Sequence, residues 1–161
     1  MSEPGAAGSV VVVGFDHHPP ALAALSFAAK LAVALGDHLR VVHVLDVSDA
    51  YPDPDADHWE QLTEARVREV HDIADRALAG MDLRWSYEAR RGPVAGELLS
   101  AAREVDATML VLGAARAGHA AALVHLVDRP VLPQVLHGHL DVPILIVPAV
   151  GRSAGLHAQT F

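Results

Sequence analysis

Residues 9–14 read Ser-Val-Val-Val-Val-Gly, an uninterrupted run of four β-branched apolar residues. A strand with one face in water alternates apolar and polar residues, whereas a strand that is covered on both faces is apolar throughout. The run therefore predicts a parallel strand in the middle of a sheet that carries helices on both faces. This places the chain in the α/β class.

The rest of the chain alternates between helical and strand patterns, as that class requires. We expect helices over 21–35, 57–79 and 94–105, and further strands over 39–45, 83–89, 108–112 and 144–147. Pro19 and Pro20 suit the first turn of the first helix, and Gly36 suits its end. Five strands separated by helices imply parallel pairs with right-handed crossovers. Ligands bind such sheets beyond the strand C-termini, so the loops that start at Gly14 and Gly113 are the candidate binding loops.

Length and composition are consistent with one domain. A chain of 161 residues, 52% of them hydrophobic, has room for a single compact core. We expect a disordered leader at 1–8, a single domain over 9–149 and a tail at 150–161. The Ala/Leu-rich stretch 21–35 is interrupted by Ser26 and Lys30 and is shorter than the ~20 apolar residues of a membrane span. We therefore expect no association with a membrane.

The charge and the absence of cysteine exclude several function classes. A formal net charge of −8 argues against a broad basic surface for nucleic acid and against a polybasic membrane patch. Without cysteine the chain has no disulfide and no thiolate metal site, and it lacks the basic region of a secretory leader, so we expect a cytoplasmic location. Charging all eleven histidines would change the net charge from −8 to +3 as the pH falls through about 6.5.

Four segments, taken in order, resemble the universal stress protein family: Val10-Val-Val-Val-Gly-Phe-Asp16, Val41-Val-His-Val44, Asp106-Ala-Thr-Met-Leu-Val-Leu-Gly113 and Val142-Pro-Ile-Leu-Ile-Val147. The resemblance covers the chain except for its termini. It implies an open five-stranded parallel sheet of order 3-2-1-4-5 with helices on both faces, a Rossmann-like fold of the adenine nucleotide alpha hydrolase-like type. It also implies a homodimer.

The resemblance to the ATP-binding branch of that family is incomplete. In that branch an Asp after the first strand faces adenine and ribose, and a loop of pattern G-x2-G-x9-G-[S/T] wraps the phosphates. Asp16 matches the Asp, and Gly113 matches the first glycine. Arg116 stands where the second glycine belongs, with Gly118 two residues later, and Arg129-Pro130 stands where Gly-Ser belongs.

These departures have physical consequences for phosphate binding. Arg116 has a Cβ, which resists the positive φ and the close backbone approach that glycine permits. Pro130 removes an amide donor, and no hydroxyl is present there for the γ-phosphate or its Mg²⁺. The arginines either offset this loss through bidentate contacts with phosphate or are solvated surface residues. The candidate nucleotide-binding residues, for ATP or AMP bound weakly, are Asp16, Val42, Gly113, Arg116, Gly118 and Arg129.

Other residues have competing interpretations. Asp16 could cap the next helix instead of binding a nucleotide. The pairs His17-His18 and His137-Gly-His139 suggest a metal, but a metal site needs three or four converging ligands, which favours structural histidines. His43, within an apolar strand, is expected to be a core histidine with a satisfied ring nitrogen. The sequence has no Gly-x-Ser-x-Gly elbow and no P-loop, so no residue set for hydrolysis or adenylation is visible.

Three functions remain. The first is a non-enzymatic universal stress protein-like module of the stress response with a weakened or lost nucleotide site. The second is an ATP- or AMP-binding switch, and the third is a small-molecule enzyme on the same fold. Independently of these, no charged residue lies between Val142 and Gly151. An apolar edge strand needs a cover, which predicts a homodimer through residues 142–148.

Overall fold

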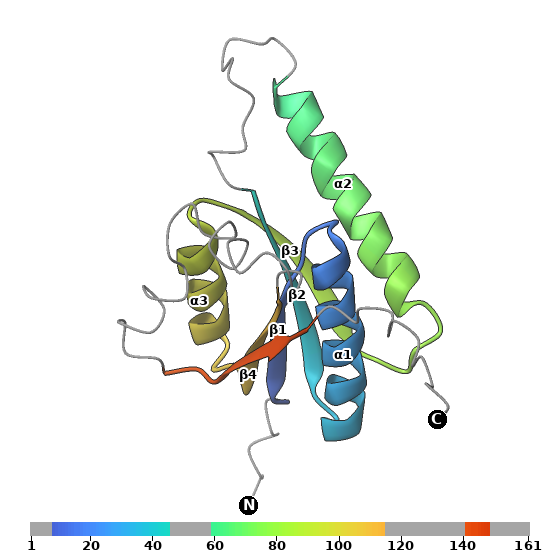
Figure 1. Cartoon of the computed structure of the whole chain (residues 1–161), viewed down its shortest axis with the longest axis vertical. Helices are drawn as coiled ribbons and strands as arrows, with labels where there is room; N and C mark the ends of the chain where they lie inside the picture. Colours follow the sequence, from blue (N-terminus) through green and yellow to red (C-terminus); the bar gives the residue numbers. More distant parts are fainter. Residues whose placement is uncertain (1–7, 46–58, 115–140, 149–161) are drawn as a thin grey trace, which may run out of the picture.

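The computed structural model describes residues 8–45, 59–114 and 141–148 (Figure 1). Five strands form one sheet in the order β3-β2-β1-β4-β5, and every neighbouring pair is parallel. This confirms the predicted fold class and strand order. The elements are β1 (Val10–Gly14), α1 (Pro19–Leu35), β2 (His38–Leu45), α2 (Trp59–Leu78), β3 (Trp85–Arg91), α3 (Val94–Glu104), β4 (Met109–Gly113) and β5 (Ile144–Val147).

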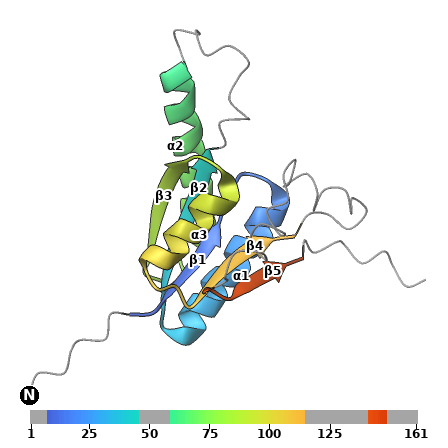
Figure 2. The same cartoon turned by 90° about the vertical axis from the view of Figure 1, so that its left-hand side faces the viewer.

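Helices cover both faces of the sheet. Helices α1 and α2 lie on one face and α3 lies on the other (Figures 1 and 2). Val11, Val12 and Val13 of β1 are all 0% exposed. Val11 and Val13 belong to the core under α1 and α2, whereas Val12 belongs to the core under α3. The central strand is therefore buried on both sides, as its run of valines predicts.

The ends of α1 follow from residues with restricted or unusual backbone angles. Pro19 and Pro20 occupy its first turn, so the helix begins two residues earlier than expected. Gly36 ends it in the left-handed region, with φ of 72°, and its N–H donates to the carbonyl of Val33 at 3.2 Å. Both expectations for these residues are confirmed.

The expected strand at 83–89 is placed two residues too early. The observed β3 is Trp85–Arg91, because its pairing with β2 runs from Leu39 opposite Trp85 to Leu45 opposite Arg91. The length and position of β2 fix this register, which the alternation of residues within β3 alone does not reveal.

Some expectations involve residues outside the described part of the chain. The expected helix 57–79 is observed as α2 from Trp59, and residues 57 and 58 lie outside it. Most of the expected leader and the whole of the expected tail also lie outside it. Among the described residues, no helix combines the length and the apolar character that crossing a membrane requires.

Candidate functional site

The switch point of the sheet lies between β1 and β4, which are parallel neighbours. Their C-terminal ends bring the loop after Gly14 and the end of β4 at Gly113 to one edge of the sheet. The first turn of α1 lies at the same edge, because a Cβ added at Gly113 would meet Pro20. The structure therefore brings Asp16, Gly113 and the start of α1 together where α/β sheets bind ligands.

Asp16 lies just beyond β1, with its side chain 41% exposed. Its Oδ1 accepts a hydrogen bond from the backbone N–H of His18 at 2.8 Å and lies 3.2 Å from Nδ1 of the His18 ring. The residue at the N-cap of α1 is His18, whose side chain makes no capping hydrogen bond. The alternative interpretation that Asp16 itself caps the helix is therefore wrong, because Asp16 closes a short turn that precedes the cap.

The start of α1 has no free backbone donor for an anion. Pro19 and Pro20 have no N–H, and the N–H of His18 is already donated to Asp16. The N–H groups of Ala21 and Leu22 both donate to the carbonyl of His18, at 3.0 and 3.3 Å. A helix N-terminus ordinarily offers its first free amides to an anion, and this one offers none.

Gly113 is required by packing. A Cβ at this position would lie 2.6 Å from the carbonyl carbon of Pro20 and 3.0 Å from the backbone nitrogen of Ala21. Both neighbours are backbone atoms, so a side chain could be accommodated only by moving α1 away from β4. Sequence reasoning missed this role, because the contact joins two segments that are far apart in the chain.

Val42 of β2 is a buried core residue that also binds the backbone just after β1. Its side chain is 0% exposed and belongs to the core under α3, and its carbonyl accepts the N–H of Phe15 at 2.9 Å. The other three candidate residues, Arg116, Gly118 and Arg129, lie outside the described part of the chain.

A model of the universal stress protein family matches residues 9–148. The chain belongs to the universal stress protein family. A family member from Burkholderia pseudomallei is 26% identical, with a TM-score of 0.64, over 91% of this chain and 100% of that one. A universal stress protein in complex with cAMP is 25% identical, with a TM-score of 0.59, over 90% and 100%. Among curated proteins there is no significant match.

A third structure, the universal stress protein from Archaeoglobus fulgidus in complex with dAMP, shares the fold at 20% identity. Its TM-score is 0.56, and the match covers 86% of this chain and 97% of that one. Two solved universal stress proteins with this fold thus hold an adenine nucleotide that carries one phosphate group.

We call the sheet edge at Asp16, Gly113 and the start of α1 the candidate ligand edge. Below this edge of the universal stress protein, His43 of β2 is 5% exposed. Its Nδ1 lies 3.0 Å from the carbonyl oxygen of Phe15, which confirms a core histidine with one satisfied ring nitrogen. Burial lowers the pKa of His43. The rings of His17 and His18 are 4.1 Å apart, and the described residues contain no group of three His, Cys, Asp or Glu side chains that could hold a metal.

A cluster of charged residues under α3, which sequence reasoning missed, joins β2, β3 and that helix. Arg40 Nε donates to Glu88 at 2.8 Å, and Arg90 Nε donates to the same carboxylate at 2.7 Å. Arg90 also donates to Glu104 at 3.0 Å and lies 3.6 Å from Glu97. The hydrogen bond with Glu104 raises the pKa of Arg90. Because both arginines are paired, the cluster offers no free cation to a phosphate.

Proposed function

We propose that this chain is a non-enzymatic stress-response module whose nucleotide site is weakened or lost. Membership of the universal stress protein family supports the stress-response function. The observation that carries the weakened site is the start of α1, where Pro19 and Pro20 have no N–H. The neighbouring amides of His18, Ala21 and Leu22 already donate to acceptors within the chain. Arg116, which follows β4 and stands where the phosphate-loop pattern has its second glycine, also weakens phosphate binding.

The two halves of a nucleotide are affected unequally. The half-exposed carboxylate of Asp16 keeps acceptor capacity toward the hydroxyl and amino groups of a nucleoside. The phosphates would have to bind near this negative charge without amides from α1 to compensate for it. We therefore expect the adenosine moiety to provide most of the affinity that remains, and each added phosphate to provide little.

Calorimetric titration of nucleotide-stripped protein with ATP, ADP and AMP tests this proposal. We expect an ATP dissociation constant of about 0.1 mM or weaker, equivalent to at most roughly 5.5 kcal/mol of binding free energy. Micromolar ATP binding would contradict the proposal. In that event Arg116→Ala should weaken ATP binding if the arginine compensates for the missing amides. Arg68→Ala, on the exposed side of α2, is the matched control.

A switch that binds an adenine mononucleotide is the second candidate. It is favoured by the structure of a universal stress protein in complex with cAMP, which is 25% identical to this chain. A ligand with one phosphate group needs fewer phosphate donors than ATP. If this candidate is right, cAMP or AMP binds more tightly than ATP, and Asp16→Asn weakens the mononucleotide. Equal, negligible heats for all of these ligands would leave the lost site as the explanation.

The non-enzymatic part of the proposal rests on the lack of a visible catalytic residue set in the sequence. We expect purified protein incubated with ATP and Mg²⁺ to release phosphate no faster than its Asp16→Asn variant. Phosphate release that is abolished by Asp16→Asn would instead favour an enzyme. We further propose a cytoplasmic location, consistent with a chain that has no cysteine.

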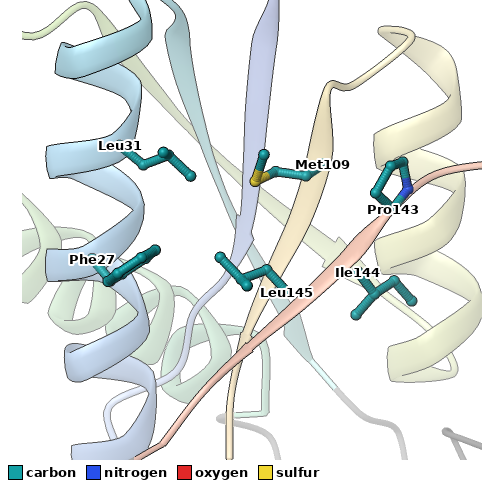
Figure 3. Close-up of a pocket in the computed structure, with 6 residues that line it drawn as sticks. All are labelled: Phe27, Leu31, Met109, Pro143, Ile144 and Leu145. Carbon is teal, nitrogen blue, oxygen red and sulfur yellow. The ribbon is translucent and has the colours of Figure 1, made fainter.

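We also propose that the chain forms a homodimer through residues 142–148. Strand β5 is the last strand of the sheet, and Ile146 on it is 40% exposed. Beside it an apolar hollow of about 330 Å³ is lined by residues of α1, β4 and β5. Phe27 and Leu31 point from α1 toward Met109 and Leu145 across this hollow (Figure 3). Antiparallel pairing with β5 of a second copy would satisfy the open edge.

A further inference from the structure

Phe15, the residue that follows β1, makes two hydrogen bonds with β2. The N–H of Phe15 donates to the carbonyl of Val42 at 2.9 Å, and the carbonyl of Phe15 lies 3.0 Å from Nδ1 of His43. A carbonyl oxygen can only accept, so Nδ1 carries the proton and donates it. The side chain of His43 thus replaces a backbone group at the point where β1 has already ended.

This contact fixes the peptide plane that leads into Asp16. The carbonyl of Phe15 and the N–H of Asp16 belong to one planar peptide unit, so a bond that holds the carbonyl also restrains the backbone of Asp16. The Asp16 carboxylate in turn accepts the N–H of His18. His43 is therefore connected to the start of α1 through a short chain of bonds, although it lies in the core below it.

The other ring nitrogen of His43 has no partner. Nε2 is buried and makes no hydrogen bond, and because Nδ1 holds the proton, Nε2 is an unprotonated acceptor. Protonation would create a buried N–H donor and a positive charge at a position that offers no acceptor. The charged and titratable groups that act on the ring are Asp16 and His17 from the β1 exit and Arg66 from α2. The hydrogen bond with Phe15 and the charge of Asp16 favour the protonated ring, whereas burial, which has the largest influence, and His17 and Arg66 oppose it.

We propose that His43 is the positioning residue of the ligand edge, and that it holds Asp16 in place when neutral and releases it when protonated. Displacement of the ring is the simplest way to give the new N–H an acceptor, and displacement breaks the bond to Phe15. The ligand edge would then be ordered at neutral pH and loosened in acid. The consequence for ligand binding rests on the proposed nucleotide edge, whereas the contact itself is testable without any ligand.

Two substitutions separate the roles of the ring. In His43→Asn the amide nitrogen can occupy the place of Nδ1 and donate to Phe15, but the side chain does not titrate. In His43→Leu the apolar volume is kept and the donor is lost. Amide hydrogen exchange of the ligand-free protein at His18 is the readout, with Val111 in β4 as an internal reference, since its strand does not contain the exit.

At pH 7.5 we expect His43→Asn to protect the His18 amide as the unmodified chain does, and His43→Leu to reduce the protection about tenfold, as expected for one lost hydrogen bond. Between pH 7.5 and 5.5, after correction for the intrinsic exchange rate, protection in the unmodified chain should fall while His43→Asn stays constant. If His43→Leu does not fold, the comparison of the unmodified chain with His43→Asn still decides. Identical pH profiles for these two proteins would overturn the proposal.

A nucleotide titration separates this inference from the proposed function. If AMP or cAMP binds, its affinity should fall in acid for the unmodified chain and change less for His43→Asn. If neither nucleotide binds, the functional proposal of a mononucleotide switch fails, and the exchange data at His18 still test His43. Constant nucleotide affinity in both proteins, in the presence of binding, would contradict the role of His43 at the ligand edge.

Discussion

The two edge strands of the sheet, β3 and β5, differ in their charged residues. Strand β3 carries Glu88 and Arg90, and Glu88 pairs both with Arg90 and with Arg40 of β2 on the α3 side of the sheet. Strand β5, at the other end of the sheet, has no charged residue between Val142 and Pro148 (Figure 2). Charged side chains discourage the pairing of an edge with another chain, and a bare apolar edge permits it. The difference indicates that the β3 edge resists pairing with a strand of another chain, whereas the β5 edge permits it.

The covering helices reinforce this contrast. On the face opposite the charged cluster, Tyr87 of β3 donates its hydroxyl to the carbonyl of Val67 in α2, at 3.2 Å. At the other edge, α1 contacts β5, and a hollow lined by Phe27 and Leu145 remains between them. Phe27 of α1, which lines this hollow, is 45% exposed. The β5 edge thus has exposed apolar side chains, Phe27 and Ile146, and no charged residue on the strand.

The largest effect should come from placing a charge on the apolar edge. Ile146→Lys should weaken the homodimer by about 100-fold or more, because a lysine at the centre of the pairing strand would be desolvated without a partner. Ser86→Lys, on the opposite edge, is the matched control and should leave the dimer intact. Sedimentation velocity at tens of micromolar measures both. A monomeric unmodified chain would refute the dimer, and an unaffected dimer in Ile146→Lys would move the interface elsewhere.

A pair of glycine substitutions tests whether the close packing of β4 against α1 contributes to stability. Gly113→Ala should destabilise the fold by about 1–3 kcal/mol, because the new Cβ would collide with the backbone of Pro20. Gly96→Ala, in α3, has no atom near its added Cβ and should stabilise by about 0.5–1 kcal/mol. Urea unfolding gives both free energies. Equal changes in the free energy of unfolding for the two variants would show that the backbone at Pro20 moves aside without loss of stability.

Removing the central guanidinium tests the charged edge. Arg90→Ala should destabilise by roughly 1 kcal/mol, because it leaves the partly buried carboxylate of Glu88 with one donor fewer. Arg68→Ala removes an exposed pair with Glu64 on α2 and should stay within about 0.5 kcal/mol. Thermal and urea unfolding compare the two variants. If both variants lose the same amount, the cluster is no more than a set of surface pairs.

Sequence reasoning succeeded where a single segment carries the signal. The run of valines in β1 required two covered faces, and Pro19, Pro20 and Gly36 marked the ends of α1. The resemblance to the family supplied the strand order, which periodicity alone could not. The register of β3 was harder to predict, because it depends on the length of β2 and not on the alternation of residues within β3.

The candidate site shows the same limit. Asp16 and Gly113 could be placed at one edge from strand order, but their contacts could not. The contact of Gly113 with Pro20 and the bond from His43 to Phe15 join segments that are distant in sequence and meet only after the sheet forms. The paired arginines were missed because Arg40 and Glu88 lie on different strands, so neither strand alone indicates an ion pair.

The smallest effect should be the change in stability in acid, which we expect at β2 and not at the β5 edge. Burial, followed by Arg84 and Arg40, lowers the pKa of His38, and burial lowers the pKa of His43, both on β2. The unfolded chain binds these protons near pH 6.5, whereas the folded chain binds them only at lower pH. The contribution of these two neutral histidines to the free energy of unfolding is therefore fully present above about pH 6.5. It is lost as the pH falls below that value.

The apolar edge should not share this response, because residues 142–148 contain no titratable side chain. We expect a lower melting temperature at pH 5.5 than at pH 7.5, with a smaller difference in His43→Asn, while the dimer dissociation constant stays within about threefold, since hydrophobic pairing does not titrate. Calorimetric melting and sedimentation on the same samples measure the two quantities. A flat melting temperature would remove the role of the β2 histidines. A dimer that dissociates in acid before the fold melts would show that the β5 edge depends on charges from elsewhere in the chain.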